Sequence, residues 1–495
     1  MGCGIVVDNV EKNEYQWKNT FSFLMALIGA VIGLGNIWRF SYVLYSNGGG
    51  AFFIPYIVSI LIMGVPFMIL EYGIGAKYKD SLSNILKKIR PNFEIIGWLI
   101  SFIIFLVLTY YIVLVGWDLY YFVLSFFKGW TSNPNAFFVE NVIVGTNDLS
   151  GLTTFVLPTL IATSCIWVLT WYISHKSLDE GLSKVVNILM PLLFVMIALI
   201  VIYSFTLNGM GLGIKELLNP DWNYLWNINV WLAALGQTVF SLSIGQAIIV
   251  TYASYLPENT KLIDNVVLVV IINSVFEIFT ALGVFSILGF MVHESGIALN
   301  EIATSGTGLL FVVFPEIFNI MGDMAYIIGP LFFLAVFFAG ITSILAFIEP
   351  LSLGISTKFK LSRQRTNTIL CFFGFLLSLI FMTASGNYLL GIVDAFLNDL
   401  IVILTIIIQS IIFAWLIDLK TLLPVLNKYS HIKVGKKWIA VTKYVLPIFL
   451  SILWVFGIIN LLNTESFTVM CIEIVFMLLI VMVPLILTVL PSKED

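Results

Sequence analysis

The amino-acid sequence predicts an all-α polytopic membrane protein with twelve transmembrane helices, arranged as a 5+5 inverted repeat with broken helices 1 and 6. Of its 495 residues, 60% are hydrophobic and only 11% are charged, which lies far outside the composition of soluble domains. Twelve apolar runs approach or exceed the length of about 20 residues that a membrane-spanning helix needs. Two of these runs are interrupted by glycine and polar residues, as in many transporters built from inverted repeats.

The apolar runs alternate with segments that carry nearly all of the basic residues. The runs lie at 20–44, 50–76, 95–126, 156–174, 184–206, 230–255, 264–291, 325–356, 367–383, 389–417, 439–461 and 467–490. With the amino terminus inside, the 24 Lys and Arg all fall in cytoplasmic segments except Arg39, Lys128 and Lys215. Because Lys and Arg accumulate on the cytoplasmic side, we expect a multi-pass protein of the cell membrane with both termini in the cytoplasm.

We expect the chain to divide into two halves of five helices each, followed by a carboxy-terminal helix pair. The predicted segments are a cytoplasmic amino-terminal tail at 1–19, a first half at 20–206, a second half at 230–417, the last two helices at 439–490, and a cytoplasmic tail at 491–495. Each half begins with an interrupted helix, and a lone glutamate follows one helix later, Glu71 in the first half and Glu277 in the second. This agreement in spacing supports the repeat.

The first interruption contains Gly29, Gly33 and Gly35, followed by Asn36 and Arg39. Glycine costs a helix about 1 kcal/mol relative to alanine, and irregular backbone at membrane depth is stable only where it faces protein or water. We therefore interpret this stretch as a helix that unwinds toward an internal cavity. For the glycines alone, close packing of helices through small residues is the alternative.

The second interruption, SLSIGQ at 241–246, places polar and glycine residues in the middle of the sixth apolar run.

Catalysis is not predicted anywhere in the chain. His175, His293 and His431 lie outside the apolar runs, and the sequence has no HExxH motif and no Cys/His metal spacing. We therefore expect a protein that is not an enzyme, while a channel or a transport-inactive sensor remains an alternative to a carrier.

Five motifs stand out along the chain: GLGNIWRF (33–40), NGGGAFFIPY (47–56), VWLAALGQTVFSLSIG (230–245), TYASY (251–255) and FFAGITS (337–343). They resemble the neurotransmitter:sodium symporter family, and most closely its prokaryotic amino-acid transporters of the LeuT type. The resemblance implies the LeuT fold and a sodium-coupled symporter that imports a neutral amino acid by alternating access, with helices 1, 2, 6 and 7 rocking against the rest. It implies an amino-acid substrate and the lipid bilayer as partners and no nucleic acid; an oligomer is possible but not required.

The resemblance also implies two sodium sites. One is expected from the carbonyls of Gly29, Ile32 and Ala339 with the hydroxyls of Thr342 and Ser343. The other is expected from the Val31 carbonyl, the side chains of Asn36, Ser241 and Asn273, and a carboxylate oxygen of the substrate. Neutral oxygens suit a hard cation, but hydroxyls in membrane helices also commonly bond to the preceding turn, which is the alternative for Thr342 and Ser343 alone.

The same resemblance predicts a substrate pocket and an outer gate. The pocket is expected to be lined by Val107, Tyr111, Phe240, Ser243, Gln246, Ile344 and Phe347, with the amides of Gly33 and Gly35 facing the substrate carboxylate. Arg39 and Asp394 match an extracellular ion-pair gate. Gln246 departs from the family pattern, because close relatives have an apolar residue there, and Asp399 has no family counterpart.

Three further expectations concern charge. Amine-transporting relatives have an aspartate where this chain has Gly33, so we expect a zwitterionic substrate. Relatives have an ion pair on the inner side at the places that here hold Glu14 and Thr357, with Lys358 beside Thr357. This exchange of signs suggests that Glu14 and Lys358 form a charge-reversed latch; two solvated loop charges are the alternative. Glu277 stands where chloride-dependent relatives have a serine, so we expect it to replace chloride and make transport chloride-independent.

Overall fold

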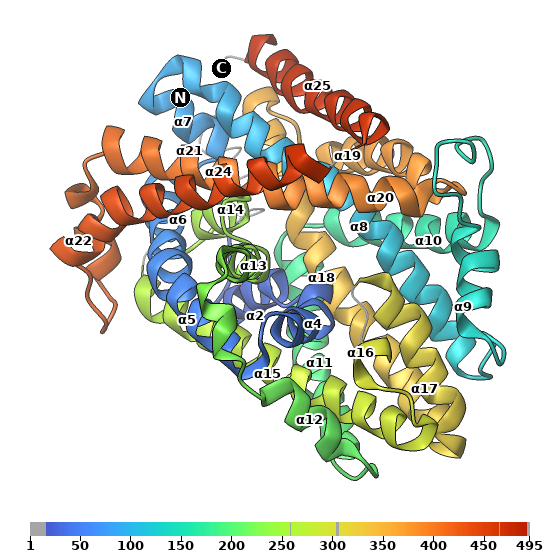
Figure 1. Cartoon of the computed structure of the whole chain (residues 1–495). Helices are drawn as coiled ribbons and strands as arrows, with labels where there is room; N and C mark the ends of the chain where they lie inside the picture. The colour runs from blue at the N-terminus through green and yellow to red at the C-terminus, as the bar shows by residue number, and fades with distance from the viewer. Residues whose placement is uncertain (1–15, 258, 303–305, 465, 493–495) are drawn as a thin grey trace.

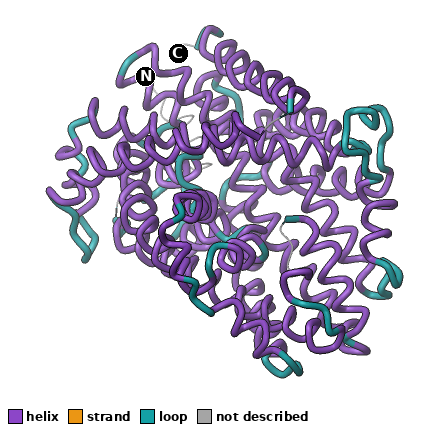
Figure 2. The backbone as a smooth tube through the Cα atoms, in the orientation of Figure 1, coloured by secondary structure: helices purple, strands orange, loops and turns teal. Residues whose placement is uncertain are grey.

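The computed structural model describes residues 16–257, 259–302, 306–464 and 466–492. Across this part of the chain, the regular elements are helices, and the one β-bridge joins the isolated residues Phe155 and Thr383 (Figure 2). Among the described residues, ten helices are long and apolar enough to cross a membrane. Together with the two interrupted helices, whose pieces are shorter, they account for the twelve predicted crossings.

The crossings are built as follows along the chain. The first half comprises α2 (Thr20–Val31), α3 (Leu34–Ile37) and α4 (Arg39–Ser46); η1 (Gly49–Phe52), α5 (Phe53–Ser59), η2 (Ile60–Gly64) and α6 (Val65–Tyr78); α8 (Glu94–Ser125); α10 (Leu157–Ser174); and η5 (Asp179–Ser183) with α11 (Lys184–Ser204). The second half comprises α13 (Ile228–Ser241) and α14 (Ile248–Ser254); α15 (Leu262–Ser295); α18 (Ala325–Phe359); α19 (Arg363–Ser378); and α20 (Gly386–Ala395), η10 (Phe396–Val402), α21 (Ile403–Ile411) and η11 (Ile412–Leu416).

The remaining crossings and the short connecting helices complete the structure. The last two crossings are α23 (Lys436–Ala440), η13 (Val441–Val445) and α24 (Leu446–Thr464), followed by α25 (Phe467–Val489). The connections contain α7 (Leu82–Ile89), α9 (Pro134–Phe137), α12 (Met210–Leu218), α16 (Leu299–Ile302), α17 (Phe314–Ile320) and α22 (Leu423–Asn427).

Both interruptions occur where the glycine and polar residues predict them. In the first, α2 ends at Val31, Ile32 and Gly33 are extended, and α3 starts at Leu34. In the second, α13 ends at Ser241 and α14 starts only at Ile248. Between them Ser243, Gly245 and Ala247 have φ angles of 49°, 77° and 61°. These left-handed conformations suit glycine and cost other residues about 1–2 kcal/mol each, so the second interruption is strained backbone.

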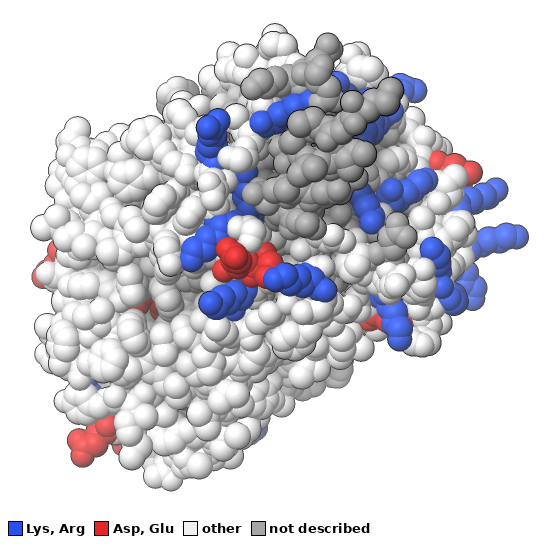
Figure 3. Space-filling model, turned by 180° about the vertical axis from the view of Figure 1, so that it is seen from behind, with Lys and Arg blue, Asp and Glu red and all other residues white. Residues whose placement is uncertain are grey.

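The interrupted helices lie in the middle of the molecule. Figure 1 shows α2, α4 and α13 surrounded by longer helices, and α2 packs against both α11 and α18. Figure 3 shows the opposite view, in which Lys and Arg gather toward one part of the surface and leave a broad expanse without charge. Such an uncharged belt is the surface that a bilayer-embedded protein presents to lipid.

Candidate functional site

The two helix interruptions meet at the centre of the molecule. The hydroxyl of Ser243 donates to the carbonyl of Ala30 at 2.8 Å, and this contact links the second interruption to the first. Within the first, the amide of Gly33 donates to the Asn36 side chain at 2.9 Å. The amide of Leu34 donates to the Tyr111 hydroxyl of α8 at 3.2 Å. The structure therefore surrounds the unwound backbone with polar groups from three crossings.

Neighbouring side chains approach the backbone closely at Gly33. A Cβ atom there would lie 2.9 Å from the Ser343 hydroxyl and 3.1 Å from the Tyr111 hydroxyl. Both distances are too short for a carbon atom without movement of the neighbours. The backbone amides on either side can thus approach a ligand that a larger residue would exclude.

The residues expected at one sodium site come together between α2 and α18. The Ser343 hydroxyl donates to the Gly29 carbonyl at 3.4 Å. The Thr342 hydroxyl bonds within its own helix, to the carbonyls of Phe338 and Ala339, both at 3.1 Å. A Cβ atom on Gly29 would lie 2.9 Å from that of Thr342. The two helices are therefore in direct contact here, with Ile32 buried just beyond the end of α2.

The residues expected at the other sodium site form one hydrogen-bonded cluster. The amide nitrogen of Asn36 contacts the Asn273 oxygen at 2.9 Å and the Ser241 hydroxyl at 3.3 Å. The Asn273 amide also donates to Ser241. The same Asn36 nitrogen lies 3.2 Å from a carboxylate oxygen of Glu277. Val31, the remaining expected ligand, is buried at the end of α2.

Glu277 is fully buried and accepts hydrogen bonds from three helices. Besides Asn36, the Gln237 amide donates to it at 2.6 Å, and the Tyr56 hydroxyl donates to its other oxygen. Gln237 in turn accepts from the Arg39 guanidinium at 2.8 Å. A chain of contacts therefore runs from Arg39 through Gln237 to Glu277. A buried carboxylate is tolerated at membrane depth when it is paired in this way.

The residues expected to line the substrate pocket are buried, apart from Phe240, which is half-buried. They are Val107, Tyr111, Ser243, Gln246, Ile344 and Phe347. The rings of Tyr111 and Phe347 meet edge to face with centroids 5.2 Å apart. Phe240 lies over Gly35 so closely that a Cβ atom on the glycine would come within 2.1 Å of the ring. The Arg39 guanidinium carbon lies 5.4 Å from the centre of the Phe240 ring.

The predicted outer ion pair between Arg39 and Asp394 is not formed in the described structure. Arg39 donates to Gln237, as described above. Asp394 accepts from Tyr110 and from Asn398, both at 2.8 Å. Each group has a neutral partner on the outer side of the pocket, so the two charges need not meet in this conformation. The side chain of Asp399 lies outside the described part of the structure.

Comparison with known proteins identifies the family. The sequence model of the sodium:neurotransmitter symporter family matches residues 14–156 and 130–492. The chain belongs to this family. An uncharacterized sodium-dependent transporter of Methanocaldococcus jannaschii is 38% identical over 88% of both chains. The sodium-dependent serotonin transporter of Drosophila melanogaster is 27% identical over 92% of this chain and 78% of its own length.

A solved structure agrees with the family assignment. The crystal structure of MhsT in complex with L-phenylalanine matches with a TM-score of 0.77 at 27% identity, covering 89% of this chain and 99% of that one. The chain is thus a sodium-dependent symporter with the LeuT fold, embedded in the membrane by multiple helices. The prediction that it is not an enzyme is confirmed, because the family and the fold are those of secondary transporters.

The predicted inner latch between Glu14 and Lys358 does not agree with the surroundings of Lys358 in the structure. Glu14 lies outside the described residues, but Lys358 is buried and already paired. Its amino group lies 2.7 Å from Glu94 and donates to the carbonyls of Leu487 and Thr488 at 2.6 and 3.0 Å. Moving Lys358 to Glu14 would leave the buried Glu94 with only the partly exposed Lys87 as a cation, and breaking a buried ion pair is costly. Lys358 therefore anchors the end of α25, and it is not a solvated loop charge.

A second buried ion pair on the inner side was not predicted. Arg363 and Glu349 form a bidentate salt bridge, and both side chains are 1% exposed. Tyr255, the residue after the end of α14, donates to the same carboxylate at 3.3 Å. The signal in the sequence was Glu349 itself, a lone acid inside the apolar run 325–356, since such acids need a buried partner. This contact connects helix 6 of the symporter to helices 8 and 9.

The backbone of the second interruption is held from two sides. The Gly245 amide lies 3.3 Å from both carboxylate oxygens of Glu71 on α6. The Gly245 carbonyl accepts from Thr405 at 3.0 Å and from Gln409 at 2.9 Å, both on α21. Glu71, predicted only as a marker of the repeat, is therefore a support for the unwound segment.

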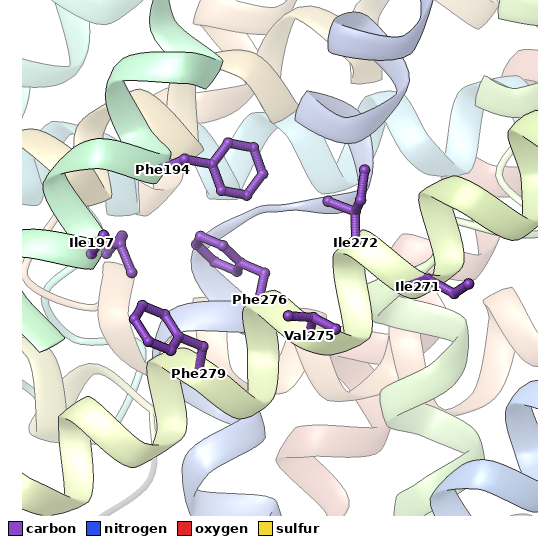
Figure 4. Close-up of a pocket in the computed structure, with 8 residues that line it drawn as sticks. Phe194, Ile197, Ile271, Ile272, Val275, Phe276 and Phe279 are labelled. Atoms are coloured by element: carbon purple, nitrogen blue, oxygen red, sulfur yellow. The ribbon is translucent and has the colours of Figure 1, made fainter.

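A hollow of about 430 Å³ lies between α11 and α15 (Figure 4). It is lined by Phe194, Ile197, Ala198, Ile271, Ile272, Val275, Phe276 and Phe279. These side chains offer nothing that could bind an ion or a zwitterion. The hollow is separate from the candidate site and belongs to the apolar outer surface.

Proposed function

We propose that the symporter couples sodium to the uptake of a neutral amino acid. The observation that carries this proposal is the meeting of the two unwound segments, where Asn36, Ser241 and Asn273 join in one buried cluster beside the extended backbone of Gly33. The amino acid bound in the similar structure of MhsT supports the substrate class. The inward rocking of helices 1, 2, 6 and 7 would then alternate access to this point.

Two sodium ions are proposed as co-substrates. The first would be held by carbonyl oxygens of Gly29, Ile32 and Ala339 and the hydroxyls of Thr342 and Ser343, which requires the Thr342 hydroxyl to exchange its bond within the helix for the ion. The second would be held by Val31, Asn36, Ser241 and Asn273. Both donor sets consist of oxygen atoms, which hard cations prefer.

The substrate is proposed to be zwitterionic. Its carboxylate would accept from the amides near Gly33 and Gly35, where the start of α3 favours an anion, and one of its oxygens would complete the sodium site at Asn36. Its ammonium group would donate to carbonyls near Phe240 and Ser243. A glycine at position 33 supplies no carboxylate, so the ligand must bring its own. Phe240 and Tyr111 would close over it, below an outer gate formed by Arg39 and Asp394.

Transport is proposed to be chloride-independent. The buried carboxylate of Glu277 lies 3.2 Å from the Asn36 amide and is surrounded by the donors of Tyr56 and Gln237. A fixed negative charge at this place would offset the charge of the sodium ion without a bound anion. Chloride at close range would meet repulsion from the same carboxylate.

The proposed orientation has both termini in the cytoplasm, with 20–206 and 230–417 as the two inverted halves. The concentration of Lys and Arg on one part of the surface supports this orientation, because basic residues gather on the cytoplasmic side (Figure 3). An oligomer is compatible with this scheme and is not required by it.

The proposal is tested by uptake into proteoliposomes with a panel of radiolabelled amino acids. We expect accumulation driven by an inward sodium gradient, none with potassium in place of sodium, and no loss when gluconate replaces chloride. Counterflow of labelled substrate should distinguish a carrier from a channel. Equal binding in sodium and potassium would refute the sodium sites, and tight binding of tryptamine or tyramine with weak binding of every amino acid would refute the zwitterionic substrate.

A further inference from the structure

Gln246 is a polar residue of the second interruption whose side chain has no hydrogen-bond partner among the described residues. The residue is 5% exposed, and its amide oxygen is completely buried. Buried polar groups nearly always have a partner. A buried amide without one destabilises a protein by an amount comparable to a hydrogen bond. Its presence here therefore calls for an explanation.

The backbone of the interruption does not need the Gln246 side chain. The amide and carbonyl of the preceding Gly245 are bound by α6 and α21, as described above. The Ser243 side chain is used by the Ala30 carbonyl. The side chain of Gln246 thus makes no contribution to the hydrogen bonds that hold this segment in its strained conformation.

The other proposed pocket residues offer little to a polar substrate side chain. Val107, Ile344 and Phe347 are apolar, and the Tyr111 hydroxyl accepts from the Leu34 amide at 3.2 Å. Among the proposed pocket residues, the Ser243 and Tyr111 hydroxyls are already hydrogen-bonded, whereas Gln246 has an acceptor oxygen that no described residue uses, together with two N–H donors. A purely aliphatic ligand would leave this amide unpaired in the closed site.

We propose that Gln246 determines substrate specificity, and that the symporter selects amino acids whose neutral side chain carries a hydroxyl or an amide group. This inference rests on the proposed function, because it assumes that the amino acid binds between the two interruptions. The Gln246 oxygen accepts a hydrogen bond from the substrate side chain. A site with a buried polar group discriminates strongly against a ligand that leaves it unpaired, whereas an apolar pocket discriminates weakly against an added hydroxyl.

The test compares ligands of equal shape in sodium. Binding is measured by competition for threonine against valine and for asparagine against leucine, since each pair differs mainly in hydrogen-bonding capacity. We expect the wild-type symporter to prefer the polar member of at least one pair by about tenfold or more. Gln246→Leu should abolish or reverse this preference. Gln246→Glu, which keeps an acceptor oxygen, should retain a preference for the polar member.

Gln364→Leu is the matched control, because Gln364 is exposed on α19 and the same substitution there should leave both ratios unchanged. Sodium-dependent binding by each variant shows that it is folded. Wild-type ratios near one in both pairs, or a polar preference that survives in Gln246→Leu, would overturn the proposal while sodium-dependent amino-acid binding still upheld the proposed function. Wild-type protein that bound no amino acid in sodium would refute both.

Discussion

Replacing Glu277 with serine should make transport depend on chloride. The substitution removes the only carboxylate in the cluster around Asn36 and leaves a space where it lay. The donors of Tyr56, Gln237 and Asn36 would then face this space without an acceptor. Chloride can occupy it, restore an acceptor for these donors, and return the negative charge.

The size of the effect follows from the geometry. The Asn36 amide nitrogen lies 3.2 Å from the carboxylate. A sodium ion on the oxygen of that amide would lie roughly 6 Å away, where two unit charges interact by about 2–3 kcal/mol at an effective dielectric constant of about 20. Since about 1.4 kcal/mol corresponds to a tenfold change, sodium affinity should fall roughly 30- to 140-fold in the absence of chloride. Unpaired donors add to this loss, at about 1–3 kcal/mol for each buried group.

The assay is sodium-driven uptake into proteoliposomes in chloride and in gluconate. Wild-type protein should transport equally in both, whereas Glu277→Ser should transport in chloride and fall to a small fraction of that rate in gluconate. Glu277→Gln is the matched control, because it keeps the shape of the side chain, removes the charge, and leaves no space for an anion. It should lose sodium affinity in both media.

Two results would refute this reasoning. Wild-type protein that stops in gluconate would show that Glu277 does not replace chloride. A Glu277→Ser variant that transports equally well in both media would show that the charge near Asn36 has no part in sodium binding.

Three further predictions concern the lid, which is the Phe240 and Tyr111 pair proposed to close over the substrate, and the buried ion pairs on the inner side. Gly35→Ala should displace the Phe240 ring, since the new Cβ would lie 2.1 Å from it, and should weaken substrate binding by tenfold or more while sodium binding persists, as measured by scintillation proximity. Tyr255→Phe removes the hydrogen bond to Glu349, worth about 1.5–3 kcal/mol to a charged acceptor, and should raise the labelling of cysteines introduced into the cytoplasmic pathway. Lys358→Met removes the buried cation beside Glu94, which keeps as a cation only the partly exposed Lys87 at 3.0 Å, so it should destabilise the protein by less than the ~3–5 kcal/mol of a fully unpaired buried charge and lower its melting temperature.

Each of these has an outcome that contradicts it. Gly391→Ala, where no atom lies within 4 Å of the new Cβ, is the control for the first, and equal behaviour of the two alanine variants would exclude the lid. Unchanged labelling in the second variant would show that the tyrosine hydroxyl does not hold the inner pathway closed. A melting temperature within error of wild type in the third would show that the buried pair adds no stability.

The fold and the interruptions could be predicted because they depend on local properties of the chain. Helix length follows from hydropathy, and Gly33 and Gly35 weaken a helix wherever it lies. The interruption at Gly245 is equally local, since its φ of 77° suits glycine. The grouping of Asn36 with Asn273 came from the family resemblance and agrees with the structure, which joins them at 2.9 Å.

The buried charges could not be predicted in the same way. Lys358 and Arg363 lie in a basic segment after an apolar run, where the sequence indicates only solvated cytoplasmic charge. Their burial depends on acids from elsewhere, Glu94 in the third crossing and Glu349 in the eighth. Which charges meet depends on how the helices pack, and no local pattern in the sequence contains that information. The outer gate is a similar case, because Arg39 finds a neutral partner in Gln237.

The peptide at Gly245 has a consequence for the speed of transport. Its amide is bound by α6, which would move with the rocking helices, and its carbonyl is bound by Thr405 and Gln409 of α21, which would stay behind. Hydrogen bonds weaken steeply once they are stretched or bent, so both carbonyl bonds must be released together before the helices can separate. The symporter would then cross a discrete activation barrier at this peptide in every cycle. The turnover rate would depend on temperature more steeply than the substrate affinity does. Residues of α21 that never touch the substrate would limit the turnover rate.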